Sequence, residues 1–439
     1  MSRNRIRRVL FTALLIMALP FTCRFIEAAE AHTYQYGRNM IVGAYFEEWS
    51  IYAANYNVAD IQSSGAADLL THVLYAFANV SATGQCAIAD TWADYQDPYL
   101  PSLNGQPYSG PLYGNFAALL QLKHLHPNLK VLISIGGASA SNTANFSTAA
   151  STAAGRSGLA SSCIDMFVSG NIAPGISAAG LFDGIDIDWE FPTNGDTENF
   201  TALIREFRSQ LNALAVTNHK KYLLTIAAPA GSQNYSNIQL AEVASQLDFL
   251  NMETYDYHGT WESTTNHAAP LRESPLDPAR GQGLYVEATI DAYLAAGVPA
   301  HKMVLGIPSY GRGWAGVPAT NFGLYESSTG AAPSPTGDSL ETDGVATYRT
   351  LETFTSSGFT LHHDPLSSAD WLYNPTSETF WTFDDPDSVA AKMEYAKFGG
   401  LGGAFQWAIK DDDANATLLK TMATGLHRAP QAAKKAASR

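Results

Sequence analysis

Short apolar runs, rich in β-branched residues, recur along the chain and are separated by longer polar or amphipathic segments. The runs are continuously apolar, which is typical of parallel strands that are covered on both faces. Eight of them have the length of a strand, and they start at Met40, Thr71, Lys130, Gly184, Tyr222, Phe249, Lys302 and Gly400.

Between these runs lie segments with apolar residues at helical spacing, for example residues 198–215. Eight alternations of strand and helix predict an α/β protein of the (β/α)8 TIM barrel class. Hydrophobic residues make up 46% of the chain, which is enough for a full core. The barrel is expected to span residues 32–426.

One connection is too long for a simple loop. Residues 312–384, between the seventh and eighth runs, contain short alternating pieces such as GFTLHHD and WLYNPTSETFWTFDD. This pattern predicts a small, mostly antiparallel α+β insertion within the barrel. The basic, small-residue-rich segment 427–439 is predicted to be a disordered tail.

The first 31 residues have the composition of a secretory signal peptide. Several arginines precede an apolar run from Val9 to Phe21, and an A-x-A cleavage site ends at Ala31. The alternative is a membrane anchor, but the apolar run is too short to span a bilayer comfortably. We therefore expect a secreted protein, cleaved near Ala31, whose mature form does not associate with a membrane.

The net charge of the mature chain indicates which classes of molecule it can bind. Removing residues 1–31 takes five Arg and two Glu from 26 basic and 41 acidic residues, which leaves 21 and 39 and a net charge near −18. Such a surface repels nucleic acid and anionic lipid, and it suits a neutral or cationic substrate. The alternative is that the acidity serves solubility alone. The mature protein is expected to be a monomer.

Two cysteines, Cys86 and Cys163, remain after Cys23 leaves with the signal segment. In an oxidising compartment they are candidates for one disulfide. The sequence does not show whether their Cα atoms come within bonding reach, so the pairing stays open.

The run FDGIDIDWEF, residues 182–191, combines the pattern of a buried strand with four carboxylates. Because side chains alternate along a strand, Asp186, Asp188 and Glu190 share one face, and the Ile and Trp residues between them share the other. If the apolar face packs under the helices, the acids line the barrel interior up to its C-terminal mouth, where barrel active sites lie. Asp183 has the opposite parity and is expected to order the turn at the start of the strand.

Three acids on one inner face raise one another's pKa, so one carboxyl can stay protonated as a general acid while another is charged. Buried salt bridges are an alternative, although the segment itself holds no Lys or Arg. A metal site is a second alternative, but it lacks a His partner set, because His362 and His363 fall in the predicted insertion. No metal or cofactor is expected.

Aromatic residues at the other strand ends point to the substrate class. Aromatic faces beside carboxylates at a barrel mouth suit pyranose rings, although each aromatic taken alone could serve core packing. The residues concerned, with two polar neighbours, are Tyr45, Trp49, Phe77, Tyr255, Asp256, Tyr310, Arg312 and Trp407.

The chain resembles glycoside hydrolase family 18, the chitinases. DGIDIDWE, residues 183–190, matches the family's D-x-x-D-x-D-x-E signature, and the resemblance runs from about Met40 to Asp413. Four further motifs follow the family's order: VGAYFEEWSIY, SIGG, TYDYHG and GAFQWAIKDDD.

The resemblance implies a role for each matching residue. Glu190 would be the general acid, followed by a cis peptide bond to Phe191. Asp188 would orient and stabilise the substrate's 2-acetamido group, with Asp186 supporting it from below. The remaining implied contacts are Tyr255 and Asp256 across the acetamido group, Trp407 beneath the sugar, and Trp49 and Trp261 as outer platforms.

The implied function is that of a secreted chitinase. It would hydrolyse β-1,4-N-acetylglucosamine linkages in chitin and chitooligosaccharides with retention, through attack by the substrate's own N-acetyl oxygen. One alternative is an endo-N-acetylglucosaminidase acting on N-glycans, a class that usually lacks the insertion. Another is a non-catalytic chitin-binding lectin, a class that usually lacks the acid at Glu190.

One position departs from the family pattern. The sixth strand usually has Met two residues before Tyr255, and here Glu253 stands there with Met252 one place early. By parity Glu253 faces the site, where it would hydrogen-bond beneath the acetamido pocket or shift the pH optimum. The alternative is a local bulge that turns Met252 inward.

Overall fold

The computed structural model describes residues 40–336 and 341–426. The predicted signal peptide, residues 1–31, and the predicted tail, residues 427–439, lie outside the described residues. Among residues 40–336 and 341–426, no helix combines the length and the apolar composition that crossing a membrane requires.

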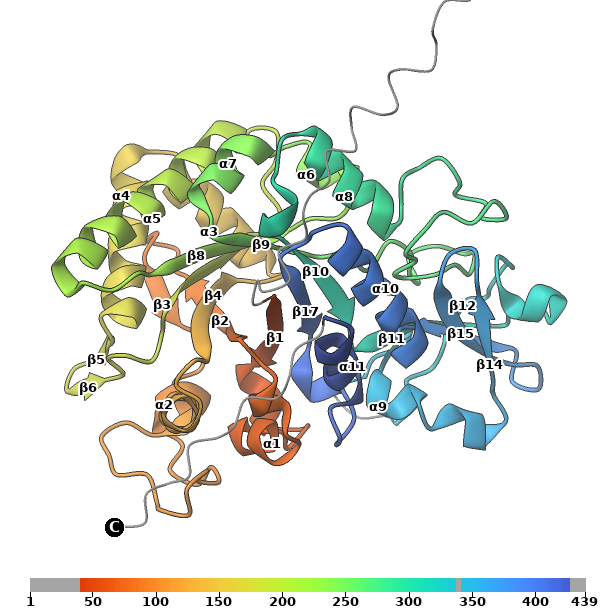
Figure 1. Ribbon diagram of the computed structural model, residues 1–439, viewed down its shortest axis with the longest axis horizontal. Helices are drawn as coiled ribbons and strands as arrows, with labels where there is room; N and C mark the ends of the chain where they lie inside the picture. The colour runs from red at the N-terminus through yellow and green to blue at the C-terminus, as the bar shows by residue number, and fades with distance from the viewer. Residues whose placement is uncertain (1–39, 337–340, 427–439) are drawn as a thin grey trace, which may run out of the picture. The chain divides into compact units, whose positions relative to one another are not determined.

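Eight parallel strands form a closed barrel, which confirms the predicted fold class (Figure 1). The order is β1-β17-β10-β9-β8-β7-β4-β2, and pairing of β1 with β2 closes the ring. Every predicted run contains one of them: β1 (Ile41–Glu47), β2 (His72–Val80), β4 (Lys130–Gly136), β7 (Gly184–Asp188), β8 (Leu223–Ala228), β9 (Phe249–Met252), β10 (Met303–Pro308) and β17 (Gly403–Trp407).

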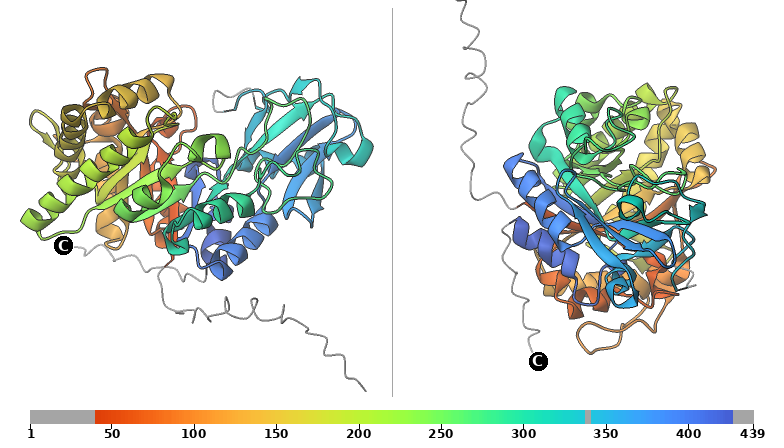
Figure 2. Two further views of the ribbon diagram at one scale, coloured as in Figure 1. Left: turned by 90° about the horizontal axis from the view of Figure 1, so that it is seen from above. Right: turned by 90° about the vertical axis from the view of Figure 1, so that its right-hand side faces the viewer.

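Helices surround the barrel, and two further views show them on its outer side (Figure 2). The main apolar core lies between these helices and the outward faces of the strands, whereas a small second cluster around Tyr45, Phe249 and Phe405 fills the barrel interior. The helices around the barrel are α1 (Val58–Ser63), α2 (Gly114–Leu125), α3 (Ala140–Ala150), α4 (Ala153–Cys163), α5 (Thr197–Asn218), α6 (Ser232–Tyr235), α7 (Leu240–Gln246), α8 (Val286–Ala295), α10 (Pro386–Phe398) and α11 (Thr417–Gly425), and α9 (Tyr348–Leu351) lies in the connection between β10 and β17.

Packing of β7 explains which way its side chains point. Trp189, directly after the strand, stacks on Phe146 of α3 at 5.2 Å and meets the edge of Phe200 of α5 at 5.7 Å between ring centroids. Ile185 and Ile187 are buried in the same outer core. Because alternate residues point to opposite faces, the acids of β7 are directed into the barrel.

The backbones of β4 and β7 approach each other closely at the C-terminal end of β7. Gly137 donates its amide hydrogen to the carbonyl oxygen of Asp188 at 2.9 Å. Gly136 has φ +124°, and a Cβ atom there would stand 2.0 Å from the same oxygen. Glycine in the SIGG run therefore lets the two backbones meet beside the inward-facing carboxylates of β7.

A second, antiparallel sheet lies in the connection between β10 and β17. Its strands run in the order β12-β11-β16-β15-β14, with β13 beside β11, and Trp314, Trp371 and Phe380 belong to its own apolar cluster. The strands are β11 (Tyr310–Ala315), β12 (Gly330–Ala331), β13 (Val345–Thr347), β14 (Thr360–Asp364), β15 (Ala369–Asn374) and β16 (Thr379–Phe383). The sheet thus begins at Tyr310, directly after the seventh barrel strand.

Three further short strands lie along the described chain. Strand β3 (Cys86–Ile88) pairs antiparallel with β2, and β5 (Asn171–Ala173) pairs with β6 (Ile176–Ser177). Cys86 of β3 is bonded to Cys163 at the end of α4, with 5.0 Å between the Cα atoms. The structure therefore joins the cysteine pair that the sequence left open.

The return from the insertion to the barrel is held by a buried ion pair. Lys392 of α10 is fully buried and donates to Asp384 at 2.7 Å. Replacing Lys392 by Met should cost about 3–5 kcal/mol in the free energy of unfolding, because it leaves a buried carboxylate without its cation. Denaturant unfolding measures this loss, with Lys420→Met on an exposed position of α11 as the control. A loss no larger than that of the control would contradict a stabilising role for the pair.

Candidate active site

A cavity of about 510 Å³ opens at the C-terminal ends of the barrel strands. Asp188 ends β7, Trp407 ends β17, and Glu253 directly follows β9. The cavity therefore lies at the mouth where barrel enzymes place their catalytic groups. The predicted residues that line it are Asp188, Glu190, Glu253, Tyr255, Asp256, Tyr310, Arg312 and Trp407.

Asp186 lies beneath this cavity and is fully buried. Its carboxylate accepts hydrogen bonds from the Tyr45 hydroxyl and the Ser134 hydroxyl, both at 2.8 Å. The Thr225 hydroxyl and the side-chain amide of Asn251 donate to its other oxygen. Burial raises the pKa of Asp186, and these four donors offset part of that rise because they stabilise the charged form.

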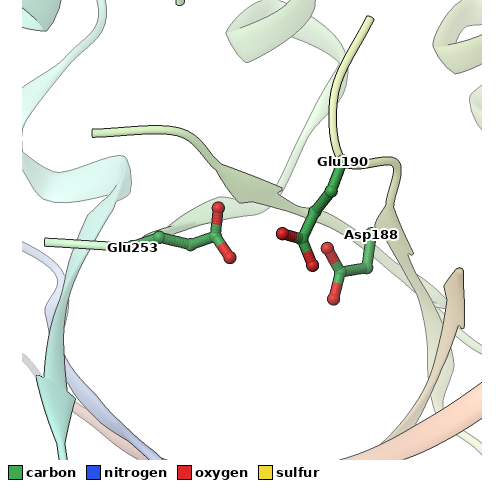
Figure 3. Close-up of side chains that lie close together, drawn as sticks. All are labelled: Asp188, Glu190 and Glu253. Carbon is green, nitrogen blue, oxygen red and sulfur yellow. The ribbon is translucent and has the colours of Figure 1, made fainter. Parts of the chain in front are cut away.

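Asp188, Glu190 and Glu253 point toward one another (Figure 3). One carboxylate oxygen from each lies within 4.8 Å of the other two. The peptide bond from Glu190 to Phe191 is cis, as the family resemblance implied. The strand that carries two of these acids thus meets a third acid from β9 at the mouth of the barrel.

Burial shifts the protonation of this cluster. It raises the pKa of Glu190 to about 7, with a further rise from the negative charge of Asp256. It also raises the pKa of Asp188, to which Glu190 and then Glu253 add by charge repulsion. The pKa of Glu253 is raised by burial and then by Glu190. At neutral pH the cluster therefore retains protons, and a neutral carboxyl is available as an acid.

Asp256 lies at the same cavity, and the guanidinium of Arg312 balances its negative charge. Arg312 binds it through two nitrogens, at 2.8 Å and 2.6 Å, and the Tyr310 hydroxyl donates to it at 2.7 Å. Tyr255 packs edge-on against Tyr310 at 6.2 Å between ring centroids. The bidentate ion pair fixes the position of Asp256 at the wall of the cavity.

The remaining aromatic residues contact the cavity wall, either directly or through one another. Trp407 stacks on Phe77 at 5.7 Å between ring centroids, and Phe77 lies 6.0 Å from Trp49. Trp261 is 60% exposed and lies under the guanidinium of Arg312 at 5.5 Å. Trp49, Phe77 and Trp261 therefore lie beside the cavity, whereas Tyr45 lies below it with Asp186.

Asp183 is separate from the site, as its parity predicted. Its carboxylate lies at the opposite end of β7, where it accepts from Lys123 at 2.7 Å and from the amide of Val131 at 3.1 Å. Lys220 reaches it at 3.1 Å. The salt-bridge interpretation thus describes this acid, and its cations come from other parts of the chain.

The departure at Glu253 turns an acid toward the cavity. Strand β9 pairs without a register shift, with Met252 opposite Ala228 of β8 and Leu305 of β10, and Met252 is buried in the outer core. The bulge alternative is therefore wrong. The expected hydrogen bond is also absent for one oxygen, because Glu253 Oε2 has no partner among the described residues.

Sequence reasoning missed an ionic group at the cavity wall. Lys410 contacts Glu47 at 2.9 Å and Asp411 at 2.7 Å, and all three residues line the cavity. Glu47 ends β1 and Lys410 follows β17, two strands that pair in the closed barrel. The sequence offered one signal for this group, because Glu47 and Lys410 stand at or just beyond the C-terminal ends of strands.

Comparisons with known proteins agree with this geometry. The sequence profile of glycosyl hydrolases family 18 matches residues 41–412. Chitinase A1 of Niallia circulans is 34% identical over 85% of this chain and 56% of its own length. Chitinase 1 of Aphanocladium album is 34% identical over 91% of this chain and 88% of its own length.

Solved structures extend the likeness to the fold. The catalytic domain of psychrophilic chitinase B from Arthrobacter TAD20 superposes with a TM-score of 0.80 at 33% identity, over 89% of this chain and 96% of that domain. Residues 41–412, which the family profile matches, include the whole carboxylate strand and the residues that line the cavity. The chain belongs to glycosyl hydrolases family 18 and is a glycoside hydrolase.

Proposed function

We propose that this protein is a chitinase that cleaves β-1,4-N-acetylglucosamine linkages in chitin and chitooligosaccharides. The observation that carries the proposal is the stacked arrangement of Asp186, Asp188 and Glu190, rising along β7 into a cavity beside Trp407. The names of the relatives support the substrate class, since several of them are chitinases.

The geometry supports a retaining mechanism in which the substrate supplies its own nucleophile. Glu190, whose pKa is near neutrality, protonates the glycosidic oxygen and later accepts a proton from water. Asp188 lies beside it and stabilises positive charge that develops on the acetamido group. Asp186, held by its four donors, keeps Asp188 in place from below.

The opposite wall would hold the acetamido group in the position for attack. Tyr255 and Asp256 line the cavity there, and Arg312 and Tyr310 fix the carboxylate of Asp256. A positioned intramolecular nucleophile reacts faster than a free one because its orientation is already set. Trp407 offers an aromatic face for the sugar ring at the same level.

We also infer that residues 1–31 act as a signal peptide and that the mature enzyme is exported. The order of basic residues, apolar run and small-residue cleavage site supports this inference. A disulfide between Cys86 and Cys163 is consistent with an oxidising compartment.

Glu190→Gln should lower the turnover of chitotetraose by a factor on the order of 10² or more, because the amide cannot donate the proton. Glu198→Gln, on an exposed position of α5, is the matched control and should retain the parent's activity. Product release is measured by chromatography, with a high-mannose glycoprotein as the competing substrate. Equal activity of Glu190→Gln and the parent would refute the assigned acid, and release of glycans without chitotetraose cleavage would refute the substrate.

The alkaline limb of the pH–rate profile should lie near pH 7. The pKa of Glu190 is raised to about 7, so the required neutral acid is present below this pH and is lost as the pH rises through it. Asp256 contributes to the rise, so Asp256→Asn should move the limb to lower pH in addition to reducing the rate. Asp291→Asn, on an exposed position of α8, is the control. Identical limbs for Asp256→Asn and the parent would show that this charge does not tune the acid.

A further inference from the structure

An ion-paired lysine lies in the cavity wall, and the proposed reaction does not use it. Lys410 is 5% exposed and belongs to η8 (Ile409–Asp411), the short 3-10 helix after β17. Its ammonium lies 2.9 Å from Glu47 Oε2 and 2.7 Å from Asp411 Oδ1, and all three residues line the cavity. Burying charged groups is costly, whereas a few placed polar groups in a cavity wall orient a ligand and give specificity.

Lys410 keeps its charge and has one donor left for a ligand. Burial lowers the pKa of Lys410, but the charges of Asp411 and Glu47 outweigh burial, so this pKa is raised. An ammonium group has three N–H donors. Within residues 40–336 and 341–426, the side-chain contacts of Lys410 engage two of them, one with each carboxylate. The third donor therefore stands beside two carboxylate acceptors.

The strand order places this ionic group across the barrel mouth from Glu190. Glu190 follows β7, and Lys410 follows β17. Three strands separate β7 from β17 in either direction around the ring: β8, β9 and β10 one way, and β4, β2 and β1 the other. The cavity reaches both walls, since Glu190 and Lys410 both line it.

The linkage of a β-1,4 chain determines which sugar reaches Lys410. A pyranose ring in such a chain is linked through C1 and C4, which lie at opposite ends of the ring. In the proposed reaction Glu190 protonates the oxygen on C1 of the sugar above Trp407, so C4 of that sugar points away from β7, toward β17 and β1. The aromatic rings next to Trp407 lie on the same side, because Phe77 belongs to β2 and Trp49 follows β1. The neighbouring sugar on the nonreducing side is therefore the one beside Lys410.

The orientation of that sugar determines which of its groups meets the lysine. Consecutive sugars of a β-1,4 chain are turned over relative to each other, so the hydroxymethyl group of one lies on the side of its neighbour's acetamido group. In the proposed complex that side is the interior of the cavity, where Asp188 and Tyr255 hold the acetamido group and where Lys410 also lies. A hydroxyl donates and accepts at one oxygen, which matches an ammonium donor beside carboxylate acceptors.

We propose that Glu47, Lys410 and Asp411 bind the primary hydroxyl group of the sugar on the nonreducing side of the cleaved bond. Lys410 donates to this oxygen, and a carboxylate beside it accepts the hydroxyl hydrogen. The inference deepens the proposed chitinase function and rests on it. Because the contact is remote from the reacting bond, it is made in the bound substrate and in the transition state alike, so it acts on KM more than on kcat.

Steady-state cleavage of 4-methylumbelliferyl chitobioside tests the contact. Its two sugars fill the position above Trp407 and the next one on the nonreducing side. The matched analogue lacks only the 6-hydroxyl group of the nonreducing sugar. The parent should cleave this analogue with a kcat/KM lower by about ten- to hundredfold, mostly through KM, because a hydrogen bond to a charged group is lost.

Lys410→Met should lower the kcat/KM of the parent substrate by a similar factor, and loss of the hydroxyl should then change little more. Lys420→Met, on an exposed position of α11, is the control and should discriminate between the two substrates as the parent does. A purely structural role of Lys410 would lower both rates by one factor and leave their ratio unchanged. If Lys410→Met does not fold, Lys410→Met with Asp411→Asn removes the cation together with one of its anions and should show the same loss of discrimination.

Equal kcat/KM of the parent on the two substrates would overturn this inference and leave the proposed function standing. An undiminished ratio in a folded Lys410 variant would also overturn it, because the hydroxyl would then be recognised by other groups. A parent protein that cleaves neither chitobioside nor chitotetraose would refute the proposed function, and this inference with it.

Discussion

A single buried carboxylate organises the barrel interior. Asp186 lies where water does not reach, and four donors from β1, β4, β8 and β9 turn toward it. A buried carboxylate is costly unless such donors satisfy it, and together they tie four strands to the one that carries it. Once Asp186 is fixed, alternation along β7 places Asp188 and Glu190 above it at the mouth.

Much of this arrangement was predictable from local pattern. The eight apolar runs indicated the strands, and the period of two along residues 185–190 separated inward acids from outward Ile and Trp. Asp183 could be set apart for the same reason, because its parity differs. Where the relevant information is the alternation of one strand, the sequence was sufficient.

Other features depend on which strands become neighbours. Lys410 meets Glu47 because β17 pairs with β1 when the barrel closes, and no pattern within either strand records that pairing. The position of Trp49 beside the cavity depends on the ring of Phe77, which comes from the neighbouring strand β2 and lies between Trp49 and Trp407. Sequence separation hides such contacts, so the pairing of Lys410 with Glu47 was missed.

The insertion follows the seventh barrel strand almost without a linker. Tyr310 and Arg312, the two partners of Asp256, belong to the first strand of that second sheet. A shortened barrel without this appendage would lose the guanidinium that balances the charge of Asp256 and the phenol that donates a hydrogen bond to it. Engineers who wish to trim the enzyme must therefore supply a new basic group from the barrel itself.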